Sequence, residues 1–315
     1  MSFYPHRTKA SAPGAVPSVE WEESQCPLCS GRDWSPLVEA PDTTVGGAGL
    51  WFVVVQCQEC GLCFTNPRPN LHSFAQFYPA SYRPHQPHEV RTPRGRSIRQ
   101  RKWSRDVQRV LSWRAEGRLL DFGCGGGSFL ARLHRMDWQV TGIDVSTAAV
   151  QRVRDELGLQ AFVGTLPHPE LRPESFDVVT MWHSLEHVHA PLEVLQEAHR
   201  LLVPGGRLVV AVPNIDSLPF RWFGPAWYGL DLPRHLTHFA PWTLHLMLER
   251  AGFRVGPVHM VRHSAWLRSS AKLAGLRQPP THWQRLLKGK PFSRLASWYC
   301  SLTRQLDCMM VVAQR

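Results

Sequence analysis

The sequence predicts an α/β protein with a doubly wound, mostly parallel sheet, preceded by a small cysteine-bearing module. Three observations support this prediction. From Arg118 onward, short apolar runs alternate with amphipathic segments, as in parallel sheets that helices cover on both faces. A glycine-rich loop follows the first apolar run, and two Cys-x-x-Cys pairs lie ahead of the alternating region.

The alternating region contains apolar runs with the length of buried strands. These runs are residues 118–123, 138–145, 159–164, 176–182, 207–213 and 308–314. Amphipathic segments that predict helices lie between them, at residues 128–135, 147–158, 191–202 and 241–253. Pro204, Gly205 and Gly206 form a stop signal for the third of these helices. Residues 264–305 are expected to be helical and basic and carry several tryptophans.

The 315 residues are enough for one large and one small domain. Composition predicts a disordered N-terminus at 1–20, a cysteine module at 21–80, a linker at 81–97 and the α/β domain at 98–315, with 264–305 as a basic helical insertion or lid. No apolar run approaches the ~20 residues of a membrane span. The N-terminus also lacks the apolar core of a secretory signal, so we expect a cytoplasmic protein without a transmembrane segment.

The net charge of +11 is concentrated in particular segments. Residues 254–315 carry eleven lysines and arginines against a single acid, Asp307. Such a segment can meet the phosphates of a nucleotide, a nucleic acid or a membrane surface, and the alternative is a solvated basic face. The aromatic side chains within 264–305 leave two interpretations open, a lid over a pocket or a peripheral contact with a membrane.

The two cysteine pairs, Cys26/Cys29 and Cys57/Cys60, have the spacing of a structural zinc site. Four thiolates complete the tetrahedral coordination of Zn²⁺ and leave no open position for catalysis. Free thiols are the alternative reading, and Cys63 is an alternative ligand three residues beyond Cys60. We therefore predict a structural Zn²⁺ in a module that resembles a zinc ribbon.

The glycine-rich loop lies in residues 119–129, LLDFGCGGGSF. Glycines at 123, 125 and 127 let the backbone turn sharply and approach a ligand closely. In doubly wound folds, ligands bind at the carboxyl ends of the strands, where this loop would lie. A dinucleotide fingerprint is less consistent with it, because Ser128 stands where the third glycine is needed and Asp121 precedes the loop.

The pattern Asp-x-Gly-x-Gly-x-Gly at 121–127 resembles that of class I S-adenosylmethionine-dependent methyltransferases. Three further stretches resemble the same superfamily in order: Asp144 in GIDVS, FDVVTMWHSLEHV at 176–188 and LLVPGGRLVVAVPN at 201–214. The resemblance extends from about residue 98 to the end. It implies a Rossmann-like, seven-stranded sheet and S-adenosyl-L-methionine as cofactor.

The resemblance also implies a role for each matching residue. The methionine end of the cofactor would lie against Asp121 and the loop glycines, the ribose hydroxyls against Asp144, and the sulfonium near the end of the fourth strand. The stretch GTLP departs from the family at the adenine edge, where many relatives carry an acid. The implied cofactor-binding set is Asp121, Gly123, Gly125, Gly127, Asp144, Val145 (or Ile143), Thr165, Leu166, Trp182 and His183.

Histidines supply the candidates for a general base, which methyl transfer to an oxygen, nitrogen or carbon acid requires. His183 and His187 follow the fourth strand, and His235 and His238 lie in LPRHLTHF. Together with the cysteine module, that stretch resembles the zinc-containing sugar C-methyltransferases, whose proposed base aligns with His235. The LEHV stretch at 185–188 resembles ubiquinone-pathway O-methyltransferases. We predict His235 as the base and His187 as the second candidate.

The sequence thus predicts methyl transfer to a small-molecule or glycan-linked acceptor, such as a nucleotide sugar. One alternative is an RNA base methyltransferase that uses the cysteine module to bind RNA. The module's mixed charge makes nucleic acid the less favoured partner. A second alternative is a non-catalytic binding protein that retains the cofactor fold.

Overall fold

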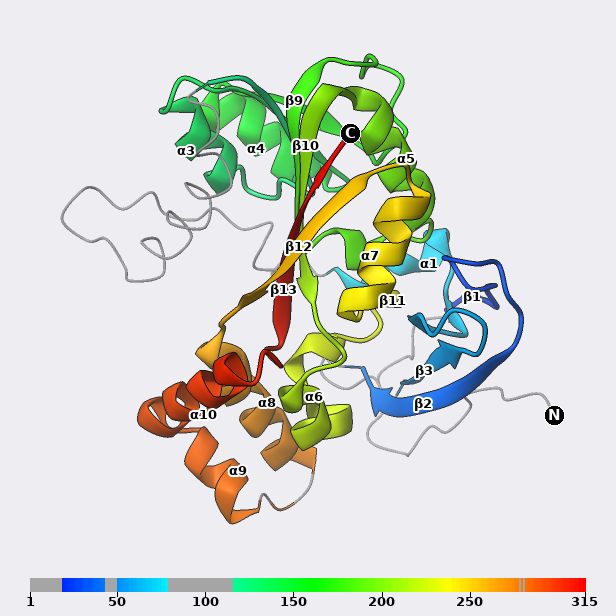
Figure 1. Ribbon diagram of the computed structural model, residues 1–315, viewed down its shortest axis with the longest axis vertical. Coiled ribbons are helices and arrows are strands. Elements are labelled where there is room, and N and C mark those ends of the chain that lie inside the picture. The colour runs from blue at the N-terminus through cyan, green and yellow to red at the C-terminus, as the bar shows by residue number, and fades with distance from the viewer. Residues whose placement is uncertain (1–18, 43–49, 79–115, 278, 280) are drawn as a thin grey trace.

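The computed structural model describes residues 19–42, 50–78, 116–277, 279 and 281–315 (Figure 1). The described part of the chain forms a seven-stranded sheet, a four-stranded sheet and a two-stranded sheet. The predicted disordered segment 1–20 lies almost entirely outside the described residues. The predicted linker 81–97 lies outside them completely.

The seven-stranded sheet has the order β12-β13-β10-β9-β6-β7-β8. Its strands are β6 (Arg118–Phe122), β7 (Gln139–Asp144), β8 (Gln160–Val163), β9 (Phe176–Trp182), β10 (Leu202–Pro213), β12 (Arg254–Val261) and β13 (Cys308–Gln314). Neighbouring strands from β8 to β10 pair in parallel, and β13 pairs antiparallel with both β10 and β12. The predicted seven-stranded, mostly parallel sheet is confirmed. Strand β12 is the one strand of this sheet that the apolar runs of the sequence did not predict.

Helices cover both faces of this sheet, as Figure 1 shows. The principal helices are α3 (Ser128–His134), α4 (Thr147–Leu157), α5 (Pro191–Leu201) and α7 (Pro241–Arg250). Helices α3 and α4 bury their apolar sides against one face, and α5 and α7 bury theirs against the other. Alternate residues divide between the two cores because successive side chains of a strand point to opposite faces: Val178 belongs to one core and Val179 to the other.

The end of α5 differs from the prediction. The helix ends at Leu201, and Leu202 already pairs with Phe176 as the first residue of β10. Pro204, Gly205 and Gly206 therefore lie within β10, where a register shift between Leu202 and Arg207 accommodates them. The Pro-Gly-Gly signal correctly indicated that the helix ends near this position. The three residues themselves form the irregular first part of β10.

The four-stranded sheet has the order β11-β4-β3-β2. Its strands are β2 (Trp34–Pro41), β3 (Trp51–Cys57), β4 (Cys63–Thr65) and β11 (Thr237–His238). Strand β11 comes from a distant part of the chain and pairs antiparallel with β4. A separate pair joins β1 (Trp21–Glu22) to β5 (Arg68–Pro69). The cysteine module is thus completed by two residues that follow the predicted base His235.

The module also packs on α7. Gly61, the residue after Cys60, has φ +66°, and a Cβ there would lie 2.2 Å from the Trp242 ring. Glycine is therefore required both by the left-handed backbone and by the close approach of the indole. Arg250, at the other end of α7, donates to the carbonyl of Leu28 at 2.6 Å.

Short helices and the basic segment complete the described chain. The short elements are α1 (Leu71–Phe74), α6 (Leu218–Phe223) and 3₁₀ turns at Ala75–Phe77, Leu185–His187, Gly224–Ala226 and Tyr228–Leu230. The basic segment forms α8 (Ser264–Arg277), α9 (His282–Leu287) and α10 (Lys290–Leu302), which confirms its helical prediction. These three helices group at one end of the sheet (Figure 1). Within the described residues, no helix is long and apolar enough to cross a membrane.

Candidate active site

The glycine loop joins β6 to α3 in a conformation that only glycine adopts readily. Gly123, Gly125 and Gly127 have φ values of +76°, +49° and +72°. A Cβ on Gly123 would lie 2.6 Å from the Cβ of Ser184, and one on Gly127 would lie 2.7 Å from Val153. The loop thus lies directly against the end of β9 and against α4. It offers a side-chain-free backbone, which is the cradle that a closely held ligand requires.

Two buried acids flank the loop. Asp144 accepts from the backbone N–H of Gly125 at 2.8 Å and from that of Ser146 at 2.9 Å. The side chain of Ser146, and not that of Asp144, caps α4. Asp121 accepts from the Thr180 hydroxyl at 2.7 Å. Burial, with a smaller effect from the charge of Asp144, raises the pKa of Asp121 to about 7.

The other residues predicted to bind the cofactor lie at the carboxyl ends of neighbouring strands. Val145 is 67% exposed directly after buried Asp144. Thr165 is exposed and Leu166 is buried, two and three residues after β8. Trp182, at the end of β9, is half-buried and meets Phe129 of α3 edge to face at 5.6 Å. The parallel strands bring these positions to one edge of the sheet, and their contacts with a cofactor stay predictions.

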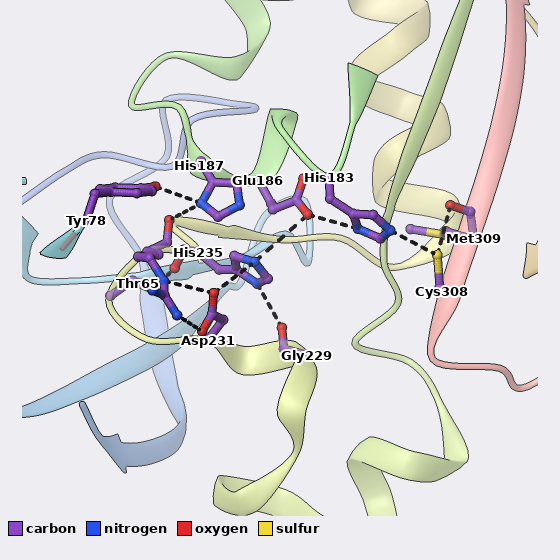
Figure 2. A network of polar contacts seen from close by, with 11 residues as sticks. Thr65, Tyr78, His183, Glu186, His187, Gly229, Asp231, His235, Cys308 and Met309 are labelled. Carbon is purple, nitrogen blue, oxygen red and sulfur yellow. Dashed lines mark hydrogen bonds and ion pairs between the residues drawn. The ribbon is translucent and has the colours of Figure 1, made fainter. Parts of the chain in front are cut away.

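A cluster of polar side chains follows β9, with Glu186 at its centre (Figure 2). Glu186 lies on the 3₁₀ turn after β9 and is fully buried. Its Oε1 lies 3.4 Å from Nδ1 of His183 and 3.9 Å from Nε2 of His235. Figure 2 shows the carboxyl group between the ring of His183 on one side and the rings of His187 and His235 on the other.

Backbone carbonyls hold both predicted bases. Nδ1 of His187 lies 3.0 Å from the carbonyl oxygen of Arg234, and Nδ1 of His235 lies 2.9 Å from that of Gly229. The two rings meet edge to face, with centroids 4.6 Å apart. Tyr78, from the cysteine module, reaches Nδ1 of His187 at 2.9 Å. His238 instead faces Thr65 of β4 at 3.1 Å.

Burial and charge act in opposite directions on the carboxylates of this cluster. Burial alone would raise the pKa of Glu186, but the adjacent His183, His187 and His235 hold it below its ordinary value. Asp231 is also kept below its ordinary pKa despite burial, chiefly by His235 and by Arg234, whose guanidinium donates to it at 2.6 Å. Burial lowers the pKa of His187 to about 4 and that of His238 to about 3.

His183 connects this cluster to α8 and β13. It has φ +52°, an uncommon conformation for a residue other than glycine and one that is often found at functional sites. Its Nε2 lies 3.8 Å from the sulfur of Cys308. The rings of His263 and Trp266 lie 6.3 and 5.3 Å from its own. One tryptophan of the basic segment therefore lies against the site.

The four cysteines of the predicted zinc site meet at one point. Sγ of Cys26 lies 3.4 Å from that of Cys60, and Sγ of Cys29 lies 3.5 Å from that of Cys57. The four sulfurs lie within 4.8 Å of one another and form no disulfide. Thiolates at ~2.3 Å from a tetrahedral Zn²⁺ would be ~3.8 Å apart, so the donor set fits this ion. Cys63 lies outside the cluster, and burial raises its pKa to about 12.

Sequence reasoning missed three members of the polar cluster. Glu186 stood inside the LEHV stretch without a separate role, although an acid beside two histidines was a usable signal. Asp231 precedes His235 by four residues and was likewise visible. Tyr78 gave no signal, because its contact with His187 joins residues that are 109 positions apart.

Comparisons with known proteins agree with this arrangement. The profile of a family described as a methyltransferase domain matches residues 96–257. The ubiquinone biosynthesis O-methyltransferase of Xanthomonas euvesicatoria is 31% identical over 172 residues, which cover 51% of this chain and 72% of that protein. The protein of the same name from Vibrio cholerae is 36% identical over 103 residues, 31% of this chain and 42% of that protein.

Among solved structures, an S-adenosylmethionine-dependent methyltransferase from Mesorhizobium loti covers 67% of this chain and 96% of its own, with 20% identity and a TM-score of 0.46. The family match spans the glycine loop, both flanking acids, and Glu186, His187 and His235 of the polar cluster. The chain therefore belongs to this methyltransferase-domain family and is an S-adenosylmethionine-dependent methyltransferase.

Proposed function

We propose that the chain transfers a methyl group to a hydroxyl of a small-molecule or glycan-linked acceptor. The observation that carries this proposal is the buried Glu186 with its histidines, placed directly after β9. Ser184, two residues earlier, touches the glycine loop, so the cluster adjoins the edge where the cofactor would lie. The two O-methyltransferase relatives support oxygen as the acceptor atom.

The cofactor supplies a methyl group that its sulfonium has already activated. The chain must therefore position the acceptor and remove its proton. We propose that Asp121 and the loop from Gly123 to Gly127 hold the methionine end and that Asp144 holds the ribose. Val145, Thr165 and Leu166 would contact the adenine, with Trp182 and His183 near the reacting group. The acceptor proton would leave at the Glu186 cluster, through His235 and His187.

A structural Zn²⁺ at Cys26, Cys29, Cys57 and Cys60 belongs to the same proposal. Its support is the four-sulfur cluster and the pairing of β4 with β11, which joins the module to the segment of His235. Zinc at this position would stabilise the fold and fix the cluster without touching the acceptor. A reducing, cytoplasmic environment would keep these thiols available.

The first prediction concerns the acceptor and the bases. Radiolabelled S-adenosylmethionine incubated with fractionated cell extract should label small polar molecules or lipid-linked glycans. His235→Ala should lower this turnover by ~10²–10⁴-fold without weakening cofactor binding, because only proton removal is lost. The exposed His245, which pairs with Glu249 on α7, supplies the control His245→Ala. Label that enters RNA would instead favour an RNA methyltransferase.

The second prediction concerns Asp121, whose pKa of about 7 lies above the ordinary 3.8. A raised carboxyl pKa stabilises the fold below pH 4, and this contribution disappears as pH rises through 7. Asp121→Asn should therefore raise the free energy of unfolding at pH 8 by at most ~4 kcal/mol and change it little at pH 4. The same variant should bind S-adenosylmethionine more weakly in calorimetry. Unchanged affinity would remove Asp121 from the proposed cofactor site.

The third prediction concerns the metal. Elemental analysis should find about one zinc per chain. Cys26→Ser should lose it, lower the melting temperature and reduce turnover more than cofactor affinity, because β4 would no longer support β11. The Cys63→Ser variant is the matched control and should keep its zinc. Full zinc occupancy in a Cys57→Ser/Cys60→Ser double variant would refute the proposed ligands.

The fourth prediction concerns α10, which we propose as a contact with an anionic lipid surface. Leu295, Trp298, Tyr299 and Leu302 form an exposed stripe with helical spacing, each more than half exposed. Basic residues precede the stripe along α9, the turn after it and the start of α10: Arg285, Lys288, Lys290 and Arg294. Exposed apolar side chains in a basic segment are the chemistry that binds a membrane interface.

The protein should therefore float with anionic vesicles at low salt and be released as salt rises, since ions screen surface charge within ~10 Å at 0.1 M. Leu295→Asp/Leu302→Asp should abolish flotation and leave the melting temperature unchanged, because both side chains are solvent-exposed. Absence of flotation by the unaltered protein would leave only the lid interpretation of this segment.

A further inference from the structure

The side chains around Glu186 also satisfy the requirements of a second metal site. A carboxylate oxygen of Glu186 and one ring nitrogen each from His187 and His235 lie within 4.8 Å of one another. Two histidines and one carboxylate are a common donor set for divalent transition-metal ions. Ligands at ~2.1 Å from one ion are ~3.0–3.5 Å apart, so the three donors need only a small inward movement.

The hydrogen bonds of the two histidines fix which nitrogen faces the cluster. The carbonyl oxygens of Arg234 and Gly229 can only accept, so the hydrogen bonds to them need a hydrogen on Nδ1 of each ring. Nδ1 of His187 also lies 2.9 Å from the Tyr78 hydroxyl, which accepts in that tautomer. In a neutral ring, Nε2 then carries a lone pair. Histidines that bind metals characteristically donate their other N–H to a carbonyl or carboxylate in this way, which holds the ring in position.

The surroundings of Nε2 in His235 favour a cation. This nitrogen lies 3.9 Å from Oε1 of Glu186 and 3.7 Å from Oδ2 of Asp231. Both distances exceed hydrogen-bond length, and a lone pair between two carboxylates is repelled by both. A cation bound by this nitrogen and the two carboxylates would replace the repulsion between them with attraction to the ion.

Glu186 provides the second, independent observation. Its side chain is fully buried, and its carboxylate lies 3.4 Å from Nδ1 of His183 without a well-aligned hydrogen bond to either oxygen among the residues that the structure describes. A buried carboxylate needs a compensating charge, because its transfer from water is otherwise very costly. Arg234 does not supply it, since its guanidinium is engaged with Asp231.

We propose that Glu186, His187 and His235 bind a divalent first-row transition-metal ion, with an oxygen of Asp231 as an adjacent fourth donor. This inference deepens the proposed function and rests on it for its catalytic meaning. A hydroxyl bound to the ion loses its proton more readily than a free one, because the ion stabilises the alkoxide. His187 and His235 thus act through the ion.

Metal binding can be measured without any acceptor, which separates this proposal from the proposed function. Co²⁺ is titrated into tag-free, full-length protein that already holds zinc at the cysteines, with calorimetry and absorption spectroscopy as readouts. One further equivalent should bind, with weak visible bands and without the intense near-ultraviolet charge transfer of sulfur ligation. Glu186→Gln should weaken this equivalent by at least ~100-fold, since even residues outside a ligand set cost 10–100-fold.

The matched control is Glu197→Gln, which alters a buried carboxylate that pairs with Arg200 at 2.6 Å on α5. It should leave Co²⁺ binding unchanged. Zinc content and circular dichroism verify that Glu186→Gln is folded, and His187→Gln repeats the test at a second proposed ligand. If no Co²⁺ binds beyond the zinc site at millimolar concentration, the proposal is overturned. A protonated His235 beside Glu186 would then supply the compensating charge. A second equivalent that survives both variants would overturn it too.

Discussion

The short pairing of β11 with β4 is the constraint on which the arrangement of this protein depends. The backbone N–H of Thr65 donates to the carbonyl of Leu236, and the N–H of Leu236 donates to the carbonyl of Glu186. The Thr65 hydroxyl donates to the carbonyl of His235 at 2.8 Å. The segment that carries His235 is thus fixed on one side by the cysteine module and on the other by the turn after β9. Neither neighbour alone would determine where the imidazole lies.

This constraint gives the cysteine module a role beyond its own stability. The two cysteine knuckles hold the strands from which β4 emerges, and Tyr78 at the module's far end reaches His187. Strand β11 in turn closes the edge of β4, which would otherwise present unpaired backbone groups. The methyltransferase domain therefore supplies a strand to the sheet of the cysteine module, and the module supplies contacts that hold the segment of His235 and the ring of His187. A change at the cysteines can reach the acceptor side through the backbone without contacting either substrate.

The proposed cofactor half of the site could be inferred from sequence because its signals are local. The three positive φ values require glycine, so the loop appears in the sequence as regularly spaced glycines. Asp144 is recognisable because it ends the next strand. The proposed acceptor half depends on contacts between distant segments. Glu186 and His235 are 49 positions apart, and only the fold brings the carboxylate to the ring. Strand β12 was missed for a related reason: its residues are only partly buried or exposed, so no continuous apolar run marks it.

The position of β13 has a consequence for how the protein forms during synthesis. This strand lies between β10 and β12 in the sheet, yet it follows both of them in the chain, after the three helices of the basic segment (Figure 1). Until residues 308–314 leave the ribosome, β10 exposes an apolar edge and β12 has no strand to pair with. An open edge of this kind is a template for association with other chains. The edge of β10 is therefore more prone to association with other chains before β13 pairs with it than afterwards.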